Sequence, residues 1–431
     1  MSKIKRYLYA LFLSYTVVLH AKTISFQEIT QKAIEESSPL KIIDSNRAIY
    51  EAKIEEIESL YYPTLSLGLN AQYSKDLDSD RRGSSSIGDT YFSDQTQYET
   101  SVSLRLNYEL YDAGVRANKI KISEIDKALV TVDYHKSIEE LKLELLDTYV
   151  KLLNIKEELR VMGDIKKLNY LIYQQKKRLY EAGEIDKLAL SSEAISLIEL
   201  DTKITTLENS LKDQLTQLSY YTKESYTLEI QLSPLSFVQH KASYSDTVTH
   251  QSFQMKERQK QYELALVKAQ KYPTVTLFGK YNLYGSKECS LWCALEDTKE
   301  RNYVVGMGIN IPIFDGFKTD ASKKRIHAEI VQLKLQDQEQ EEIFFHKQYK
   351  NKVNLQSISN QIEQTQESIK EQQYKSTMVE RLRAVHEIDS FSEIKEQIAT
   401  LYNLLTLHKH FIEESAKLKE MEILNDTGGR E

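Results

Sequence analysis

The sequence contains few of the residues that interrupt a helix. Its 431 residues include 13 glycines and 5 prolines, whereas average usage is about 7% glycine and 5% proline. Because these two residues are the least compatible with a helix interior, their scarcity argues against a series of small, turn-rich domains. It predicts a few very long helices instead.

An excess of positive charge is also missing. The chain carries 57 Lys and Arg residues and 64 Asp and Glu residues, which gives a net charge of −7. This composition does not indicate the excess of basic residues that is typical of nucleic-acid-binding proteins. No glycine-rich phosphate loop, nucleophile elbow or Cys–His pairing is present, and His408-Lys409-His410 is expected to be a surface pair. The sequence therefore predicts no enzyme activity, no cofactor and no metal site.

Cysteine is nearly absent, and the two that occur are close together, Cys289 and Cys293. In an exported protein this spacing predicts a disulfide that closes a short loop. Two free thiols are the alternative, and a metal site would need further ligands.

No apolar run is long enough to cross a membrane as a helix. The longest, Tyr7–Leu19, falls short of the roughly 20 residues that a span needs. It follows the basic stretch Lys3–Arg6 and precedes Ala21, which predicts a cleaved signal peptide at 1–21; an uncleaved anchor is the alternative. An exported chain of this kind can cross a membrane only as strands.

The chain contains an internal repeat. Tyr61–Leu67 (YYPTLSL) resembles Lys271–Leu277 (KYPTVTL), and Leu110–Gly114 (LYDAG) resembles Ile313–Gly316 (IFDG). Each repeat is predicted to contain a helix, two strands, a very long helix, a sharp break and a return helix. The expected regions are a first repeat at 22–222, a linker at 223–247, a second repeat at 248–420 and a tail at 421–431. The expected elements are strands at 63–75, 97–111, 273–285 and 301–314, long helices at 116–182 and 318–385, and return helices at 187–222 and 390–420.

The four predicted strands have the pattern of membrane-spanning barrel strands. Apolar residues alternate with polar or small ones, as in Leu65, Leu67 and Leu69, over about 10–12 residues. A half-buried sheet in a soluble domain would alternate in the same way. Four strands cannot close a barrel, and an open edge cannot face lipid, so several copies must share one barrel, and three copies would supply twelve strands. The tyrosines expected to anchor the strands at the membrane interfaces are Tyr73, Tyr98, Tyr108, Tyr281, Tyr284 and Tyr303.

Several stretches, taken in order, resemble the TolC-like outer-membrane efflux protein family. They are SSPLKIIDSNRAIYEAKIEEIESLYYPTLSLGLNAQY, NYELYDAG, RLYEAGEIDKLAL, NIPIFDG and TLYN. The resemblance implies a mixed α and β membrane protein that forms a homotrimer. Long antiparallel helical hairpins would form a periplasmic α-barrel, and four strands per chain would join a shared 12-stranded β-barrel in the outer membrane of a Gram-negative bacterium.

The resemblance also implies a function and partners. The protein would be a passive exit duct surrounded by outer-membrane lipid. It would work with a periplasmic adaptor and an inner-membrane pump or ABC transporter, in a tripartite efflux or type I secretion system. The alternative is an exported periplasmic coiled-coil scaffold or adaptor-type protein without a membrane barrel.

Three groups of residues are candidates for function under this resemblance. A pair of acids beside the second break would gate the periplasmic aperture; alignment on TLYN places it at Glu393 and Glu396, and alignment on the internal repeat places it at Ser392 and Lys395. We prefer the glutamates. The candidates for adaptor contact at the hairpin tips are Gly183, Glu184, Ile185, Asp186, Leu188, Glu387, Ile388 and Asp389. The candidates for the strand-to-helix junctions are Asp112, Gly114, Pro312, Asp315 and Gly316.

Overall fold

The computed structural model describes residues 23–73, 85–87, 90–92, 98–238, 243–384 and 390–425. They divide into two compact units, each of which draws on both sequence repeats. The hairpin unit comprises the described parts of Met1–Ile42, Tyr134–Val248 and Gln340–Glu431, and the sheet unit comprises those of Ile43–Asp133 and Thr249–Glu339. The sequence repeats are therefore not the compact units, because the long helices of each repeat pass from one unit into the other.

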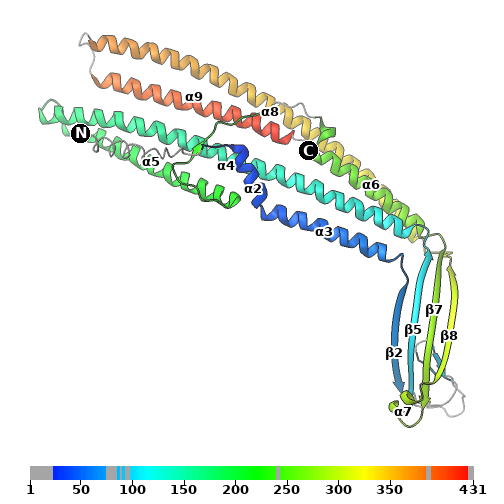
Figure 1. Ribbon diagram of the computed structural model, residues 1–431. Helices are drawn as coiled ribbons and strands as arrows, with labels where there is room; N and C mark the ends of the chain where they lie inside the picture. Colours follow the sequence, from blue (N-terminus) through cyan, green and yellow to red (C-terminus); the bar gives the residue numbers. More distant parts are fainter. Residues whose placement is uncertain are drawn as a thin grey trace, which may run out of the picture. The chain divides into compact units, whose positions relative to one another are not determined.

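The sheet unit contains a four-stranded antiparallel sheet. Its strands are β2 (Thr64–Tyr73), β5 (Tyr98–Tyr111), β7 (Thr274–Lys287) and β8 (Glu300–Asn310), in the order β2-β5-β7-β8 (Figure 1). Strands from the two repeats thus meet at the central pair, β5 and β7. Between β2 and β5 the chain also forms a small hairpin of β3 (Ser85–Ile87) and β4 (Thr90–Phe92).

The strand register gives the sheet one apolar and one polar face. Leu67 lies opposite Leu104, which lies opposite Tyr281, which in turn lies opposite Tyr303. Because side chains alternate between faces along a strand, the apolar residues two positions away in each strand share this side. The apolar face includes Leu65, Leu67, Leu69, Val102, Leu104, Leu106, Leu277, Tyr281, Tyr303, Val305, Met307 and Ile309.

The opposite face carries polar and charged side chains. Gln72 pairs with Glu99, Arg105 lies opposite Lys280, and Asn282 Nδ2 donates to Asn302 Oδ1 over 2.7 Å. Tyr284 also belongs to this face, since it lies opposite Ser101. Of the tyrosines predicted to anchor the strands, Tyr284 thus lies on the polar face near the end of β7, whereas Tyr73, Tyr98, Tyr108, Tyr281 and Tyr303 lie on the apolar face.

The sheet ends earlier than expected at β8. The strand stops at Asn310, and Ile311–Phe314 lie outside the ladder, so the predicted strand end at 314 is wrong. Alternation continues through Ile311 and Ile313, but Pro312 has no N–H for a ladder hydrogen bond. The partner strand β7 also begins only at Thr274, which lies opposite Asn310.

Long helices continue from the strands. They are α4 (Val115–Glu181) after β5 and α8 (Lys318–Ala384) after β8, and 67 residues each give a length of about 100 Å. α3 (Ser38–Ser59) leads into β2, with Pro39 in its first turn, and α6 (Val248–Ala269) leads into β7. Among the described residues, no helix has the length and apolar character that a membrane span requires.

Within the sheet unit, polar pairs join neighbouring helices in the order α3, α4, α6, α8. Lys127 of α4 pairs with Glu51 of α3 over 2.7 Å, and Asp126 of α4 accepts from Gln259 of α6 over 2.6 Å. Lys260 of α6 in turn pairs with Glu329 of α8 over 3.0 Å. α4 and α6 therefore have a helical neighbour on each side.

The hairpin unit repeats this arrangement with the return helices. α5 (Lys187–Thr222) follows α4, and α9 (Ser390–Leu424) follows α8 (Figure 1). Ion pairs link α5 to α4 through Glu193 and Lys176 (2.5 Å) and α4 to α9 through Glu158 and Lys409 (2.6 Å). α9 extends beyond residue 420, so the first residues of the predicted tail are helical.

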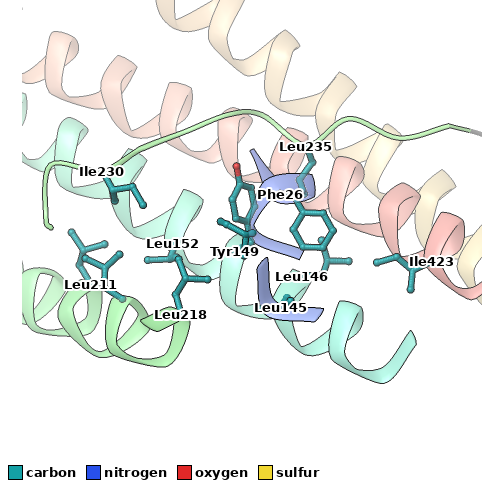
Figure 2. Packing of buried hydrophobic residues seen from close by; sticks show 13 residues of the cluster. Phe26, Leu145, Leu146, Tyr149, Leu152, Leu211, Leu218, Ile230, Leu235 and Ile423 are labelled. Carbon is teal, nitrogen blue, oxygen red and sulfur yellow. The ribbon is translucent and has the colours of Figure 1, made fainter. Parts of the chain in front are cut away.

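The largest apolar cluster of this unit gathers short segments against α4. α2 (Phe26–Glu36), which begins with a capping box between Ser25 and Glu28, contributes Phe26, and α4 contributes Tyr149 (Figure 2). Ile230 and Leu235, from the segment predicted as a linker, are also buried in it. In the same segment β6 (Gln231–Leu232) pairs in parallel with β1 (Thr23–Ile24), and a single 3-10 turn spans Tyr244–Asp246.

Tyr149 links these segments through hydrogen bonds. Its hydroxyl lies 3.1 Å from the carbonyl oxygen of Ile24 and 2.7 Å from that of Ser233. Burial raises the pKa of Tyr149 to about 12, although the hydrogen bond to Ser233 acts in the opposite direction. The linker between the repeats is therefore a packed part of the unit, which its low helical pattern did not predict.

Candidate functional site

The first candidate site is the crossing from β5 into α4. The carboxylate of Asp112, directly after the strand, accepts the backbone N–H of Gly114 over 3.0 Å and that of Arg116 over 2.7 Å. These are N–H groups that a helix start leaves without a partner. Ala113 and Gly114 have φ of 56° and 84°, so the chain turns through two left-handed residues before the helix begins.

Arg116 completes this crossing and was not predicted from the sequence. Its Nε donates to Asp112 over 2.9 Å, and its Nη1 donates to the carbonyl oxygen of Leu60 over 2.8 Å. The guanidinium also lies 4.4 Å from the ring centroid of Tyr61. The side chains of Arg116 and Asp112 are only 5% and 10% exposed, so one buried ion pair joins the end of β5, the start of α4 and the segment that leads into β2.

The electrostatics of Asp112 follow from these contacts. Burial disfavours its charged form, but the hydrogen bonds from the Arg116 backbone, the Arg116 side chain and the Gly114 backbone outweigh it. The pKa of Asp112 consequently lies below its ordinary value of 3.8. The carboxylate is ionised at neutral pH and holds the turn.

The second crossing, from β8 into α8, has the same backbone plan but different side chains. Asp315 accepts the N–H of Thr319 over 3.0 Å and also its hydroxyl, and these two bonds lower the pKa of Asp315. Gly316 and Phe317 both have φ of 65°. Thr319 takes the place of Arg116, and an exposed pair between Lys271 and Asp320 (3.1 Å) joins the chain before β7 to α8.

Exposed apolar side chains surround the second crossing. Ile313, Phe314 and Phe317 are all largely exposed, and the two phenylalanine rings contact each other edge to face at 5.4 Å. Pro312 lies in this segment beyond the end of β8 and makes no ladder contact. Among the predicted junction residues, the structure thus assigns capping to Asp112 and Asp315 and left-handed turns to Gly114 and Gly316.

The second candidate site is the end of the first hairpin. The N–H of Gly183 donates to Tyr180, and that of Glu184 donates to Leu179, which is the Schellman pattern that ends a helix at a left-handed glycine. Gly183 has φ of 74°, and Asp186 then caps α5 by accepting the N–H of Ala189 over 2.8 Å. Gly183, Glu184, Asp186 and Leu188 are exposed, Leu188 by 77%, whereas Ile185 is half-buried.

The two predicted gate acids both form ion pairs across the second hairpin. Glu393 of α9 pairs with Arg383 of α8, and Glu396 pairs with Lys375 over 2.8 Å and accepts from Gln372. The two carboxylate side chains are 19% and 15% exposed. Within a single chain, each glutamate therefore already has a cation beside it, which the sequence pattern did not predict.

The remaining candidates are placed as follows. Glu387, Ile388 and Asp389 lie outside the described residues. His408 and Lys409 contact Glu157 and Glu158 of α4, and no group of His, Cys, Asp or Glu residues that could hold a metal ion occurs in the described parts of the chain. A disulfide joins Cys289 and Cys293, whose Cα atoms are 6.2 Å apart.

Residues 29–222 match the model of the outer membrane efflux protein family. A search of the curated proteins gives no significant match.

The described fold is that of solved outer-membrane channels. The structure of CusC has a TM-score of 0.75 at 13% identity, covering 93% of this chain and 92% of its own. VceC from Vibrio cholerae gives 0.72 at 12% identity, with 94% and 96% covered, and the CmeC outer membrane channel of Campylobacter jejuni gives 0.73 at 13% identity, with 94% and 86% covered. At such low identity the likeness establishes the fold, in which an α-barrel is joined to a β-barrel.

Proposed function

Because residues 29–222 match the model of the outer membrane efflux protein family, we propose that the chain is the exit duct of a tripartite efflux or type I secretion system. The observation that carries the proposal is the open sheet with one apolar and one polar face. Its outer strands, β2 and β8, each pair with a strand of the sheet on one side only among the residues that the structure describes. An unpaired edge cannot remain in lipid, so further copies must complete the sheet.

The resemblance to the TolC-like family implies a homotrimer, and the strand number is compatible with it. Three copies would place twelve strands in one barrel, with β2 of one copy beside β8 of the next. The apolar face would then contact the lipid of the outer membrane, and the polar face, with Arg105 and Lys280, would line the water-filled interior. The energy for transport would come from an adaptor-linked pump or ABC transporter in the inner membrane, since a duct of this kind has no chemistry of its own.

The experiment follows the full chain through membrane fractionation and into a planar bilayer. We expect the protein to remain in outer membranes after a carbonate wash, to migrate as a trimer in detergent until it is heated, and to produce ion-conducting steps in the bilayer. Release of a monomer by carbonate would contradict the channel and favour the alternative, a periplasmic coiled-coil scaffold.

The exposed end of the first hairpin is the proposed contact for the adaptor. Changing Leu188 to Asn removes an exposed apolar side chain that supports neither Gly183 nor the Asp186 cap. We expect this variant to form normal heat-sensitive trimers but to restore less export than the native protein in cells that lack the native chain.

The matched control is Gly183→Ala, which puts a side chain on a left-handed residue at a cost of about 1–2 kcal/mol. It should reduce both trimer yield and export, because it disturbs the turn itself. If Leu188→Asn exports at the native level, the first hairpin end is not an adaptor contact through this residue.

A further inference from the structure

The loop between β7 and β8 contains a short helix, α7 (Leu291–Glu296), that packs on the sheet. Ser290 caps it by accepting the N–H of Cys293 over 3.2 Å, and the disulfide to Cys289 ties its first turn to the preceding residues. The side chain of Ala294 is fully buried, whereas Leu291, Trp292 and Leu295 are exposed, Trp292 by 69%. One face of the helix therefore packs on the sheet, while these three apolar side chains remain exposed.

The register shows which side of the sheet carries α7. Thr100 lies opposite Gly285, and both belong to the same face as Val102 and Leu283 because they are two residues away in each strand. Thr100 Oγ1 donates to the carbonyl oxygen of Ala294 over 3.0 Å. A Cβ atom on Gly285 would lie 2.5 Å from that same oxygen, so α7 rests on the apolar face at a position that only glycine allows.

The height of α7 on this face matches the thickness of an apolar membrane layer. Val275 lies near the start of β7, opposite Ile309 of β8. From Val275 to Gly285 the strand is about 34 Å long. If β7 is tilted by about 40° to the membrane normal, this length spans about 26 Å of membrane thickness. An outward apolar band is about 25 Å tall in barrels of this kind. Tyr73 and Tyr98, whose rings lie 5.0 Å apart, occupy the row just beyond Gly285.

We propose that α7 is a membrane-interface anchor, which lays Leu291, Trp292 and Leu295 into the headgroup region of the lipid around the channel. The inference rests on the proposed channel function, because it needs the apolar face to contact lipid. Tryptophan favours this boundary, since its ring is apolar and its N–H finds polar partners there.

A lipid surface fits the exposed face of α7 better than a second copy of the chain does. The unpaired edges of the sheet are β2 and β8, whereas α7 contacts mainly the central strands β5 and β7. A neighbouring copy that pairs at an edge would leave this face uncovered. On the central strands β5 and β7, by contrast, the apolar surface runs from Leu104 and Tyr281 through Val102 and Leu283 to the foot of α7, and Arg301 of β8 lies beside Leu283 near its upper border.

The test uses the fact that Trp292 is the single tryptophan of the sequence. The full-length protein is reconstituted in phosphatidylcholine vesicles whose acyl chains carry bromine either near the headgroup or near the chain end. We expect Trp292 emission to shift to the blue on reconstitution, to lose more intensity with the shallow bromines than with the deep ones, and to be poorly quenched by aqueous iodide.

Two variants in a Trp292→Phe background calibrate the result. Tyr303→Trp reports from the apolar face and should be quenched most by the deep bromines. Val304→Trp, one residue further on the polar face opposite Lys280, should be quenched by iodide and not by lipid.

The outcomes separate the two proposals. If Tyr303→Trp is quenched by lipid while Trp292 responds only to iodide, the anchor is wrong and the channel stands. If neither Trp292 nor Tyr303→Trp responds to brominated lipid, the apolar face does not contact lipid, and both proposals fall.

Discussion

Replacing Arg116 with methionine is expected to destabilise the first strand-to-helix crossing by about 3 kcal/mol. Removing one partner of a buried ion pair costs roughly 3–5 kcal/mol, because the other charge stays buried without compensation. The low end applies here, since the backbone N–H groups of Gly114 and position 116 would still bind the carboxylate of Asp112. The variant also loses the donor to Leu60 and the contact with Tyr61. Urea unfolding of the detergent-solubilised protein measures the change as a lower midpoint at the same slope.

The acid side of the stability profile provides a second readout. The pKa of Asp112 is lowered in the folded protein, so its stabilisation is present above the ordinary value of 3.8 and is lost as the pH falls through the lowered pKa. In Arg116→Met, burial remains while the cation is gone, and the loss of stability should therefore begin at a higher pH than in the native protein.

The second crossing supplies the matched control. Lys271→Met breaks an exposed pair with Asp320, and exposed pairs contribute little to stability. An equal change in midpoint for Arg116→Met and Lys271→Met would contradict the assignment of the first crossing as the stronger joint. Adding Asp112→Asn to Arg116→Met should recover part of the lost stability, because no unpaired charge then stays buried.

The crossings also illustrate how far sequence patterns predict this fold. Alternation located all four strands, and the near absence of Gly and Pro predicted α4 and α8, because these signals are local and extend over many residues. The end of β8 was misplaced, since an apolar alternation through Ile313 does not reveal whether a partner residue exists on β7. The role of Arg116 could not be predicted, because its contact with Leu60 joins residues far apart in the chain.

Prediction from the sequence was limited in the same way for the loop helix α7 and for the two acids predicted to form the gate. The spacing of Cys289 and Cys293 predicted their disulfide, but only the register of β5 on β7 places the loop on the apolar face. Glu393 and Glu396 were predicted to gate the periplasmic aperture. Their partners Arg383 and Lys375 lie on the facing helix, and the sequence pattern does not show which side chains meet across the hairpin.

Exchanging the charges of Arg383 and Glu393 is expected to distinguish two ways in which this pair could act in a channel. In one, the carboxylates form a ring that binds cations and obstructs the aperture. In the other, the pairs Arg383–Glu393 and Lys375–Glu396 hold α9 against α8 and keep the aperture narrow. Conductance and its block by divalent cations, recorded in planar bilayers, report on the two possibilities separately.

The paired arrangement leads us to expect the second outcome. The single variants Glu393→Gln and Glu396→Gln should each raise the open fraction, and the exchange variant Arg383→Glu plus Glu393→Arg should restore the native level because the pair re-forms with reversed direction. With the cationic partners half-exposed, each pair contributes about 0.5 kcal/mol. Six pairs in a trimer would then sum to about 3 kcal/mol, a shift of about 150-fold in the opening equilibrium when both glutamates are replaced.

The exchange variant decides the question because it keeps the contact between positions 383 and 393 while it reverses the charge at each position. If the carboxylate ring is the gate, the exchange should abolish cation block as completely as Glu393→Gln does, since a guanidinium then occupies the position of the carboxylate. If the pair is the gate, the exchange should conduct like the native protein while Glu393→Gln does not. Native conductance and native cation block in the double variant Glu393→Gln plus Glu396→Gln would exclude both mechanisms, and the two glutamates would then only join α8 to α9.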